Sequence, residues 1–227
     1  MSTDSGTSTL ILVPAYNAAV TLPELLERIH AVDPDLPVLV VDDGSTDGTS
    51  QIGAAHANVV TVRHTVNRGK GEALKSGFGW ALANGYAWVL SIDADLQHPP
   101  ETIPAFMELA GMDRLVIGCR SRRGVGMPVD RQLSNFLTSI VASIMSGRTI
   151  PDSQCGMRLI PANLIRRLEL KQGGFTLESE LLLEASRAGC QIVPLPVPTV
   201  YGPAGSHIRH VTDSWRFVSL IFKQLWR

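Results

Sequence analysis

Along the first half of the chain, short runs of apolar residues alternate with apolar residues at helical spacing. Residues 10–13 are continuously apolar and end at Pro14, as expected for a strand that is buried on both faces. Over 22–32 the apolar positions recur every three or four residues, which predicts an amphipathic helix. Thr21 and Glu24 have the spacing of a capping box that would start this helix. The alternation continues, with strands predicted at 38–41, 59–62, 87–92 and 114–118 and a helix at 70–83.

This order of elements predicts an α/β fold, in which a mostly parallel sheet carries helices on both faces. Ligands bind such sheets at the carboxyl ends of the strands. Polar residues follow the predicted strands at these ends: Tyr16 and Asn17, Asp42 and Asp43, residues 67–70, and residues 93–98. The sequence therefore predicts one binding site along that edge of the sheet.

The second half of the chain has a less regular pattern. It predicts an apolar-rich helix at 132–145, a strand at 157–160 and a helix at 178–188. Residues 191–200 are extended, and their three prolines favour a sheet edge because proline has no N–H to donate to a neighbouring strand. Residues 213–227 mix aromatic and apolar residues with Arg and Lys. This is typical of a helix in a lipid headgroup interface, or of one packed on protein.

The domain organisation expected from these patterns is simple. The length of 227 residues suits one domain with an appendage. Residues 1–8, rich in Ser and Thr, are expected to form a disordered tail. Residues 9–207 are expected to form the α/β domain, and residues 208–227 a C-terminal amphipathic helix.

Net charge, apolar stretches and cysteine spacing exclude several classes of protein. The formal net charge of −1 gives no overall positive field, so nucleic acid is not an expected partner. No apolar, uncharged stretch reaches the length of about 18 residues that a membrane-spanning helix needs. Cys119, Cys155 and Cys190 lack metal-binding spacing and are expected to be reduced thiols. We therefore expect a cytoplasmic protein, with peripheral contact at the inner face of the membrane.

The sharpest chemical feature is the pair Asp93 and Asp95 after the fourth predicted strand. Residues two apart at a strand end point to the same side, and two carboxylates held together repel unless a cation or proton joins them. Gln97 adds a carbonyl oxygen on that side. Oxygen ligands without His or Cys indicate Mg²⁺ or Mn²⁺. The alternative is a polar turn, and for His98 a turn position is preferred over a ligand or base.

Two further loops carry candidate ligand contacts. Asp42 and Asp43 are assigned to the ligand side of the loop after the second strand, with Ser45 or Thr46 capping the next helix. Residues 67–71 contain two glycines and open a helix, so their backbone and Lys70 suit an anion, although the spacing is neither that of a Walker A loop nor of a dinucleotide fingerprint.

Arginines gather between residues 114 and 131, where Asp130 is the single acid. A solvated face is one explanation of such a run. The other is a glycine-containing loop beside the strand ends that binds a second phosphate through forked hydrogen bonds. The arginines are Arg114, Arg120, Arg122, Arg123 and Arg131.

Together these motifs resemble the GT-A glycosyltransferases of family 2, and within them the dolichol-phosphate (polyprenyl-phosphate) mannose synthase branch. The resemblance spans nearly the whole chain from Thr9. It rests on Pro14-Ala15-Tyr16-Asn17, Val41-Asp42-Asp43-Gly44-Ser45-Thr46-Asp47, Asn67-x-Gly69-Lys70-Gly71 and Asp93-Ala94-Asp95-Leu96-Gln97-His98-Pro99.

The resemblance implies the GT-A fold and metal-dependent, inverting transfer of a hexose from a nucleotide-sugar, GDP-mannose or a UDP-hexose, to a polyprenyl phosphate. It also implies site roles. Pro14, Tyr16, Val41 and Asp43 would line the nucleoside pocket, Asp93 and Ala94 would touch ribose and diphosphate, Asp95 and Gln97 would hold the metal, Arg120 and Arg131 would bind phosphate, and His207 would take a donor-binding position where relatives have Lys. The chain departs from the family pattern at Ala18 and Thr199, where relatives have an acidic and a basic residue.

Two other functions fit the same residues. A transferase with a hydroxyl acceptor, such as a growing glycan, needs a general base, which Glu178 or Glu180 would supply. A non-catalytic nucleotide-sugar-binding protein would bind the donor and release no nucleoside diphosphate. A phosphate acceptor, by contrast, is largely deprotonated near pH 7 and requires positioning by arginines instead of a strong base.

Overall fold

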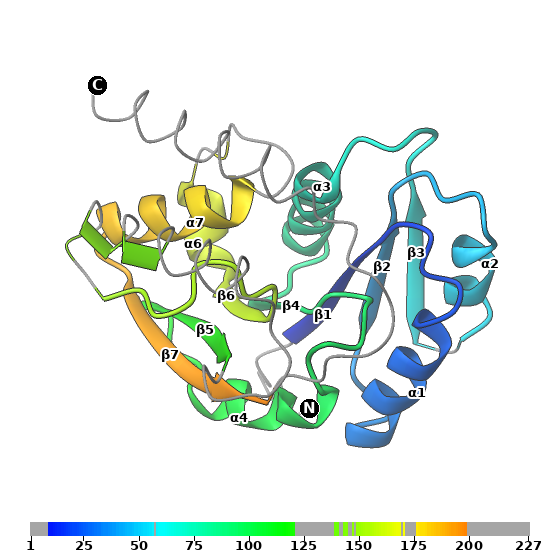
Figure 1. Ribbon diagram of the computed structural model, residues 1–227, viewed down its shortest axis with the longest axis horizontal. Coiled ribbons are helices and arrows are strands. Elements are labelled where there is room, and N and C mark those ends of the chain that lie inside the picture. The colour runs from blue at the N-terminus through cyan, green and yellow to red at the C-terminus, as the bar shows by residue number, and fades with distance from the viewer. Residues whose placement is uncertain are drawn as a thin grey trace, which may run out of the picture.

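The computed structural model describes residues 9–56, 58–120, 139–140, 143–144, 147, 149–168, 170 and 176–198. A seven-stranded sheet runs through this part of the chain in the order β3-β2-β1-β4-β6-β5-β7. Figure 1 shows the sheet with its helices. The strands are β1 (Thr9–Ala15), β2 (Val38–Asp42), β3 (Val59–Arg63), β4 (Trp88–Ser91), β5 (Arg114–Arg120), β6 (Arg158–Pro161) and β7 (Gln191–Val197).

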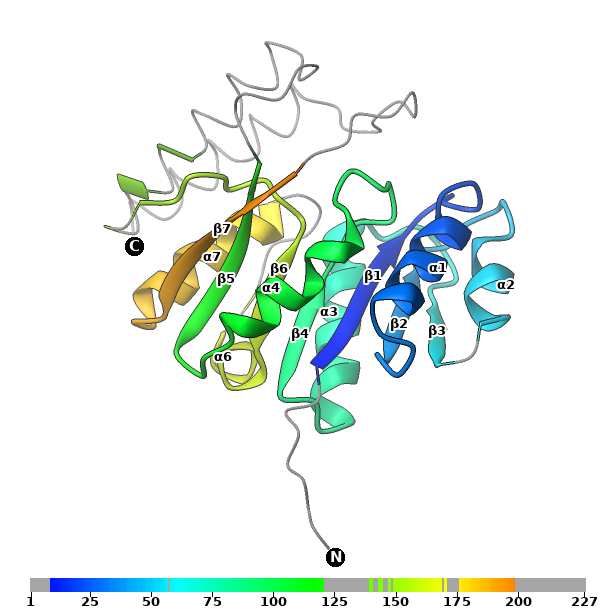
Figure 2. The same ribbon diagram turned by 90° about the horizontal axis from the view of Figure 1, so that it is seen from below.

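Helices cover both faces of the sheet, as the sequence predicts. Figures 1 and 2 show α3, α6 and α7 on one face and α1 and α4 on the other, while α2 lies beside β2 and β3. The helices are α1 (Leu22–Val32), α2 (Thr49–Ala54), α3 (Lys70–Ala83), α4 (Ile103–Glu108), α6 (Ala162–Arg167) and α7 (Thr176–Arg187), with a 3₁₀ turn at Pro100–Thr102. The sequence patterns predict α1, α3 and α7 but not α4 or α6, which are only six residues long.

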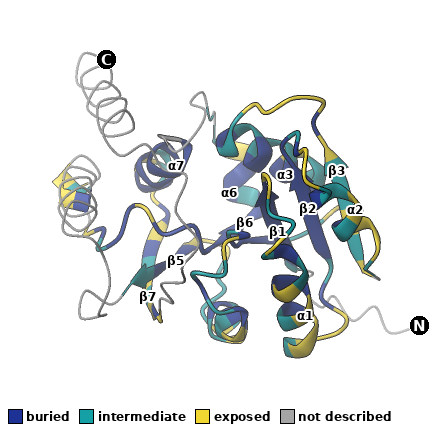
Figure 3. Ribbon diagram, turned by 45° about the vertical axis from the view of Figure 1, so that its right-hand side comes forward, coloured by how far each residue is buried: buried dark blue, intermediate teal, exposed yellow. Residues whose placement is uncertain are grey.

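The continuous apolar run of β1 is explained by burial on both faces. Leu10 and Leu12 pack into the core under α3, whereas Ile11 and Val13 pack into the core under α1 and α4. All four are fully buried, and each contributes about 1.5–3 kcal/mol relative to an exposed position. Figure 3 shows the resulting contrast between the buried central strands and the exposed outer side of α1.

The sheet is parallel from β3 to β4, but β6 is antiparallel to both β4 and β5. The edge position predicted for the proline-rich strand is confirmed, because β7 ends the sheet next to β5. Pro194 and Pro196 are two residues apart. Their missing N–H groups therefore belong to one side of the strand, and both prolines lie in register with β5, opposite Ile117 and Cys119.

The predicted helix starts are correct in one case and wrong in the other. Thr21 is the N-cap residue of α1, with Pro23 in the first turn, but its hydroxyl donates to the Ala18 carbonyl at 3.4 Å and makes no capping hydrogen bond to the helix. The N-cap of α2 is Gly48, not Ser45 or Thr46. The Ser45 hydroxyl instead accepts a hydrogen bond from the Asn17 N–H at 2.9 Å, so it joins two loops.

Several predictions fall outside the described residues. These are the tail 1–8, nearly all of the helix 132–145, the arginine-containing segment 121–131 and the amphipathic helix 208–227. Across the ranges that are described, no helix has the length and apolar character to cross a bilayer. The three cysteines are free thiols, with Cys155 and Cys190 buried.

Candidate functional site

The carboxyl ends of the parallel strands bring the predicted polar loops together. β1 pairs with β2 on one side and β4 on the other, so the residues after Ala15, Asp42 and Ser91 leave the sheet at one edge. Tyr16 stands exposed there, with 46% of its surface accessible. Pro14 and Val41 are buried beneath this edge.

Lys70, the first residue of α3, forms the centre of a charged corner. Its Nζ lies 2.6 Å from Asp93 Oδ1 and 3.0 Å from Glu178 Oε1 on α7. Burial alone would lower the pKa of Lys70, but the two carboxylates outweigh burial and raise that pKa. The ammonium in turn holds the pKa of Asp93 below its ordinary value, although burial opposes this. These ion pairs connect the start of α3, the loop after β4 and the first turn of α7.

Asp93 also rests against the backbone of Gly156, in the segment that leads into β6. A Cβ atom at position 156 would collide with the Asp93 carboxylate. The Ser91 hydroxyl donates to the Gly156 carbonyl at 2.8 Å and holds the two segments in register. Glycine is therefore required at this position for Asp93 to take its place.

Asp95 lies next to this corner and differs from Asp93 in having no cation paired with it in the described structure. Its carboxyl group reaches solvent but is crowded by protein atoms. This crowding and the charge of Asp93 raise the pKa of Asp95 to about 6. The Gln97 N–H donates to Asp95 Oδ1 at 3.0 Å, so the loop folds back over the carboxylate. Ala94 is buried between the two acids.

The oxygen atoms at this corner fit a hard divalent cation. Within the described ranges, no cluster of three or more His, Cys, Asp or Glu residues could hold a metal on its own. Mg²⁺ is commonly bound through one or two carboxylates together with water and substrate phosphates. The exposed Asp95 carboxylate suits that kind of shared site. The Asp93 carboxylate lies close to it, and water or substrate oxygens can supply the remaining metal ligands.

Asp43 is buried and holds a network of protein donors. Its Oδ1 accepts hydrogen bonds from His64 Nδ1 at 2.7 Å and from the Arg68 N–H at 3.0 Å, and its Oδ2 accepts from the Gly69 N–H at 2.6 Å. Asp42 is also fully buried. Its Oδ1 accepts the Ser45 N–H at 2.9 Å, whereas its Oδ2 has no hydrogen-bond partner among the described residues and lies 3.4 Å from Arg63 Nε. The assignment of Asp42 to the ligand side stays a prediction.

Arg120, at the end of β5, is held by Asp152. Its Nε and Nη2 donate to the two Asp152 oxygens at 2.7 and 2.9 Å, and its backbone N–H donates to the same carboxylate at 3.1 Å. Burial would raise the pKa of Asp152, but these hydrogen bonds and the guanidinium charge lower it. Asp152 is thus a positioning partner of Arg120, a role that sequence spacing does not reveal.

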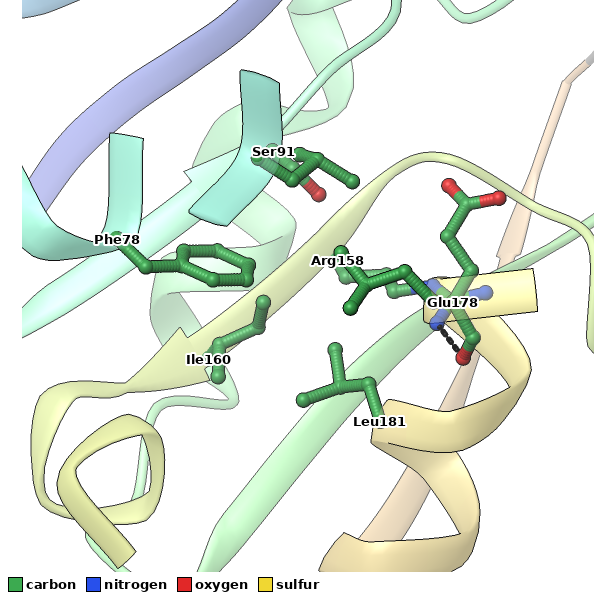
Figure 4. Close-up of a pocket in the computed structure, with 8 residues that line it drawn as sticks. Phe78, Ser91, Arg158, Ile160, Glu178 and Leu181 are labelled. Carbon is green, nitrogen blue, oxygen red and sulfur yellow. Dashed lines mark hydrogen bonds between the residues drawn. The ribbon is translucent and has the colours of Figure 1, made fainter. Parts of the chain in front are cut away.

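Arg158 explains why Glu178 reaches Lys70. The Arg158 guanidinium is 1% exposed and donates to the carbonyls of Cys155 at 2.9 Å, Ser153 at 2.8 Å and Glu178 at 2.5 Å. It therefore ties the first turn of α7 to the segment before β6. Figure 4 shows Arg158 and Glu178 beside Phe78 and Leu181 around a cavity of about 10 Å³, which has room for about one water and none for a sugar.

His98 is a buried residue of the turn after Asp95. Its Nε2 lies 3.6 Å from Cys155 Sγ, and burial lowers its pKa to about 4, so the ring is neutral near pH 7. Arg131 and His207, which were predicted to bind phosphate and donor, lie outside the described residues. The structure therefore brings together Tyr16, Asp43, Lys70, Asp93 and Asp95, and adds His64, Asp152 and Gly156 as supporting residues.

Comparisons with known proteins identify the family of this chain. The model of the family "Glycosyl transferase family 2" matches residues 10–168. An undecaprenyl-phosphate mannosyltransferase of Micrococcus luteus is 32% identical over 201 residues, covering 84% of this chain and 83% of its own. A polyprenol monophosphomannose synthase of Mycolicibacterium smegmatis is 30% identical over 202 residues, covering 83% of this chain and 76% of its own.

A structural neighbour shows the same fold. It is glucosyl-3-phosphoglycerate synthase from Mycobacterium tuberculosis, solved with Mn²⁺, uridine diphosphate and phosphoglyceric acid. It is 20% identical, has a TM-score of 0.77, and the match covers 96% of this chain and 78% of that one. The predicted GT-A fold is thereby confirmed. With the family model matching most of the chain and both curated relatives at 30% identity or more, the protein belongs to glycosyl transferase family 2 and is a glycosyltransferase.

Proposed function

We propose that this glycosyltransferase moves a hexose from a nucleotide-diphosphate sugar to a polyprenyl phosphate, with Mg²⁺ or Mn²⁺ held by Asp95 and Gln97. The observation that carries the proposal is the corner at which Lys70 pairs with Asp93 at 2.6 Å beside the exposed Asp95. The names of the Micrococcus and Mycolicibacterium relatives support a polyprenyl acceptor.

The donor, GDP-mannose or a UDP-hexose, lies in this proposal along the edge formed by the ends of β1, β2 and β4. Its nucleoside packs against the exposed Tyr16, with Pro14, Val41 and Asp43 forming the wall behind. Asp93 and Ala94 lie beside the ribose and diphosphate, where Lys70 supplies positive charge. A divalent ion on Asp95 would neutralise the departing nucleoside diphosphate.

The acceptor phosphate needs orientation more than proton removal, because a phosphomonoester with a pKa of about 6 is already largely ionised at pH 7. Arg120 is held rigidly by Asp152, so it serves as a fixed positive charge for phosphate. Arg131 is proposed as the second arginine on the basis of the family resemblance. Because the acceptor is a lipid, contact of residues 208–227 with the inner face of the membrane is part of the proposal.

The alternative of a hydroxyl acceptor needs Glu178 or Glu180 as general base. Glu178 is 6% exposed and forms an ion pair with Lys70 at 3.0 Å, and Glu180 is 4% exposed. A buried carboxylate that is bound to an ammonium is a poor acceptor for a substrate proton. The geometry around Glu178 therefore favours the phosphate acceptor.

The decisive experiment incubates the protein with a panel of nucleotide-sugars, Mn²⁺ and a short polyprenyl phosphate, and follows the lipid by mass spectrometry. We expect addition of a single hexose from one donor. Asp95→Asn should reduce the rate at saturating Mn²⁺ by about 100-fold or more, because it removes the proposed ligand charge. Asp35→Asn is a matched control, since Asp35 is an exposed residue of the turn before β2.

Transfer to glycan hydroxyls but not to polyprenyl phosphate would overturn the acceptor assignment. An Asp95→Asn protein as active as Asp35→Asn would overturn the assignment of Asp95 to the metal.

A further inference from the structure

His64 belongs to none of the motifs that the proposed function uses, yet it is built into the site. It follows β3 directly, and its backbone N–H donates to the Asp42 carbonyl at 2.8 Å, which extends the pairing of β2 with β3 by one residue. The Asp43 N–H in turn donates to the Ala15 carbonyl of β1 at 2.8 Å. The sheet itself therefore places the His64 and Asp43 side chains next to each other.

Both ring nitrogens of His64 are engaged. Nδ1 lies 2.7 Å from Asp43 Oδ1, and Nε2 lies 2.9 Å from the Ser76 hydroxyl on α3. An ionised carboxylate only accepts, so Nδ1 carries a proton and donates to Asp43, while Nε2 and the Ser76 hydroxyl share the second hydrogen bond. The side chains of His64 and Asp43 are 8% and 3% exposed, so water competes little for these bonds.

Asp43, held by His64, in turn fixes the backbone at the start of α3. Its two oxygens accept the backbone N–H groups of Arg68 and Gly69, the two residues that precede Lys70. Gly69 adopts a φ of 93°, a conformation that L side chains avoid, and its N–H bond to Asp43 measures 2.6 Å. A carboxylate free to rotate would release the Arg68 amide and leave the Gly69 amide with Asn67 Oδ1 at 3.0 Å as its remaining acceptor, which loosens the loop that positions Lys70.

We infer that His64 is a positioning residue for donor binding. Its Nδ1–H fixes the Asp43 carboxylate, Asp43 fixes the loop before α3, and the loop sets Lys70 against Asp93. The effect on nucleotide affinity rests on the proposed function, whereas the effect on the loop does not. The Ser76 hydroxyl contacts the opposite side of the ring. It should contribute less to the position of Asp43, because it contacts the imidazole and not the carboxylate.

Two amide substitutions separate the ring nitrogens. The Nδ2–H₂ group of Asn reaches the position of the histidine Nδ1 and retains a donor to Asp43. The longer Gln places its amide near Nε2, so it contacts Ser76 and leaves Asp43 without that donor. Ser76→Ala removes the contact at Nε2 alone. All three proteins are checked by thermal melting for folding at the assay temperature.

The first readout is hydrogen exchange of the Arg68 and Gly69 amides by NMR in the ligand-free protein. In His64→Gln the Arg68 amide should exchange about tenfold faster or more, and the Gly69 amide should lose less protection because Asn67 Oδ1 also accepts it. In His64→Asn and Ser76→Ala both amides should stay within about threefold of wild type. Equal protection in His64→Gln and His64→Asn would overturn the inference, because ring volume and not the Nδ1 bond would then matter.

The second readout is calorimetric binding of UDP and GDP in the presence of Mn²⁺. For whichever nucleotide the wild type binds, His64→Gln should weaken affinity about tenfold while His64→Asn restores it to within about threefold. Unchanged affinity in His64→Gln would overturn the link to the donor. A wild-type protein that binds neither nucleotide would contradict the proposed function, and amide exchange would still decide whether His64 positions the loop.

Discussion

The two halves of the sheet are built on different principles. From β3 to β4 every strand is parallel, and the polar groups stand in the loops directly after the strands. In the other half β6 runs antiparallel to both of its neighbours, and the principal charged groups are buried: Asp152 pairs with Arg120, and Arg158 donates to backbone carbonyls. In the proposed function the first half presents side chains to a ligand, and the second half holds the backbone that supports them.

Two of the contacts between the halves involve charged residues of the candidate site. Glu178 from α7 reaches across to Lys70 on α3, and the Gly156 backbone lies under Asp93. Each contact places a residue of the second half behind a predicted ligand-binding residue of the first. If this division is correct, substitutions in the second half should cost stability first, and those at the meeting points should cost ligand binding first.

The largest effect is expected at Arg158. Arg158→Met leaves the carbonyls of Ser153, Cys155 and Glu178 without their donor in a buried site. A buried carbonyl left without its donor costs about 1–3 kcal/mol, so the loss of all three donors is expected to cost about 3–5 kcal/mol. Urea denaturation should show a decrease of this size in the free energy of unfolding. Arg28→Met is the comparison, because Arg28 pairs with Glu101 at the surface and contributes about 0–1 kcal/mol.

An Arg158→Met protein that loses no more stability than Arg28→Met would contradict the division between the halves. The buried arginine would then be dispensable for the second half of the sheet.

Asp152→Asn should have the next largest effect, and its size should depend on pH. Arg120 holds the pKa of Asp152 below its ordinary value of 3.8, so the folded state favours the ionised carboxylate. The stabilisation is therefore fully present above about pH 4 and is lost as the pH falls through the lower, folded-state pKa. We expect Asp152→Asn to cost about 2–3 kcal/mol at pH 7 and progressively less in acid.

Denaturation of wild type, Asp152→Asn and Asp35→Asn over a pH series checks this expectation. The Asp35→Asn curve should run within about 0.5 kcal/mol of wild type throughout. A cost for Asp152→Asn that stays constant down to pH 3 would show that the Asp152 charge does not contribute.

The same contrast explains what the sequence predicts and what it does not. In the first half, buried parallel strands are uniformly apolar, so their ends are marked by the first polar residues, and Asp43, Lys70, Asp93 and Asp95 stand out. Those markers also carry the family resemblance, and the strands and helices predicted there form with small shifts in their boundaries.

In the second half the informative contacts join residues far apart in the chain. The partner of Arg120 is 32 positions away, and that of Lys70 is 108 positions away. A local sequence pattern contains no information on such distant pairs. Asp152 and Glu178 were therefore not predicted as the partners of Arg120 and Lys70. The cap predicted at Ser45 failed for a related reason: Ser45 bonds to Asn17, 28 residues earlier, because tertiary packing supplies a donor that a local pattern does not show.

Gly156→Ala is expected to change stability least. It also tests most directly the contact between the two halves at Asp93. Gly156→Ala places a Cβ against the Asp93 carboxylate, which must move away from Lys70. We expect a loss of about 1 kcal/mol in stability and a loss of about tenfold or more in affinity for nucleoside diphosphate with Mn²⁺. Calorimetry and urea denaturation of the same protein separate the two effects.

Gly79→Ala is the matched control, because the same methyl group on α3 would contact nothing. It should leave nucleotide affinity unchanged and raise stability by about 0.5–1 kcal/mol, since alanine favours a helix interior. Nucleotide affinity retained in Gly156→Ala would mean that Asp93 tolerates displacement. The second half of the sheet would then support the fold without shaping the site.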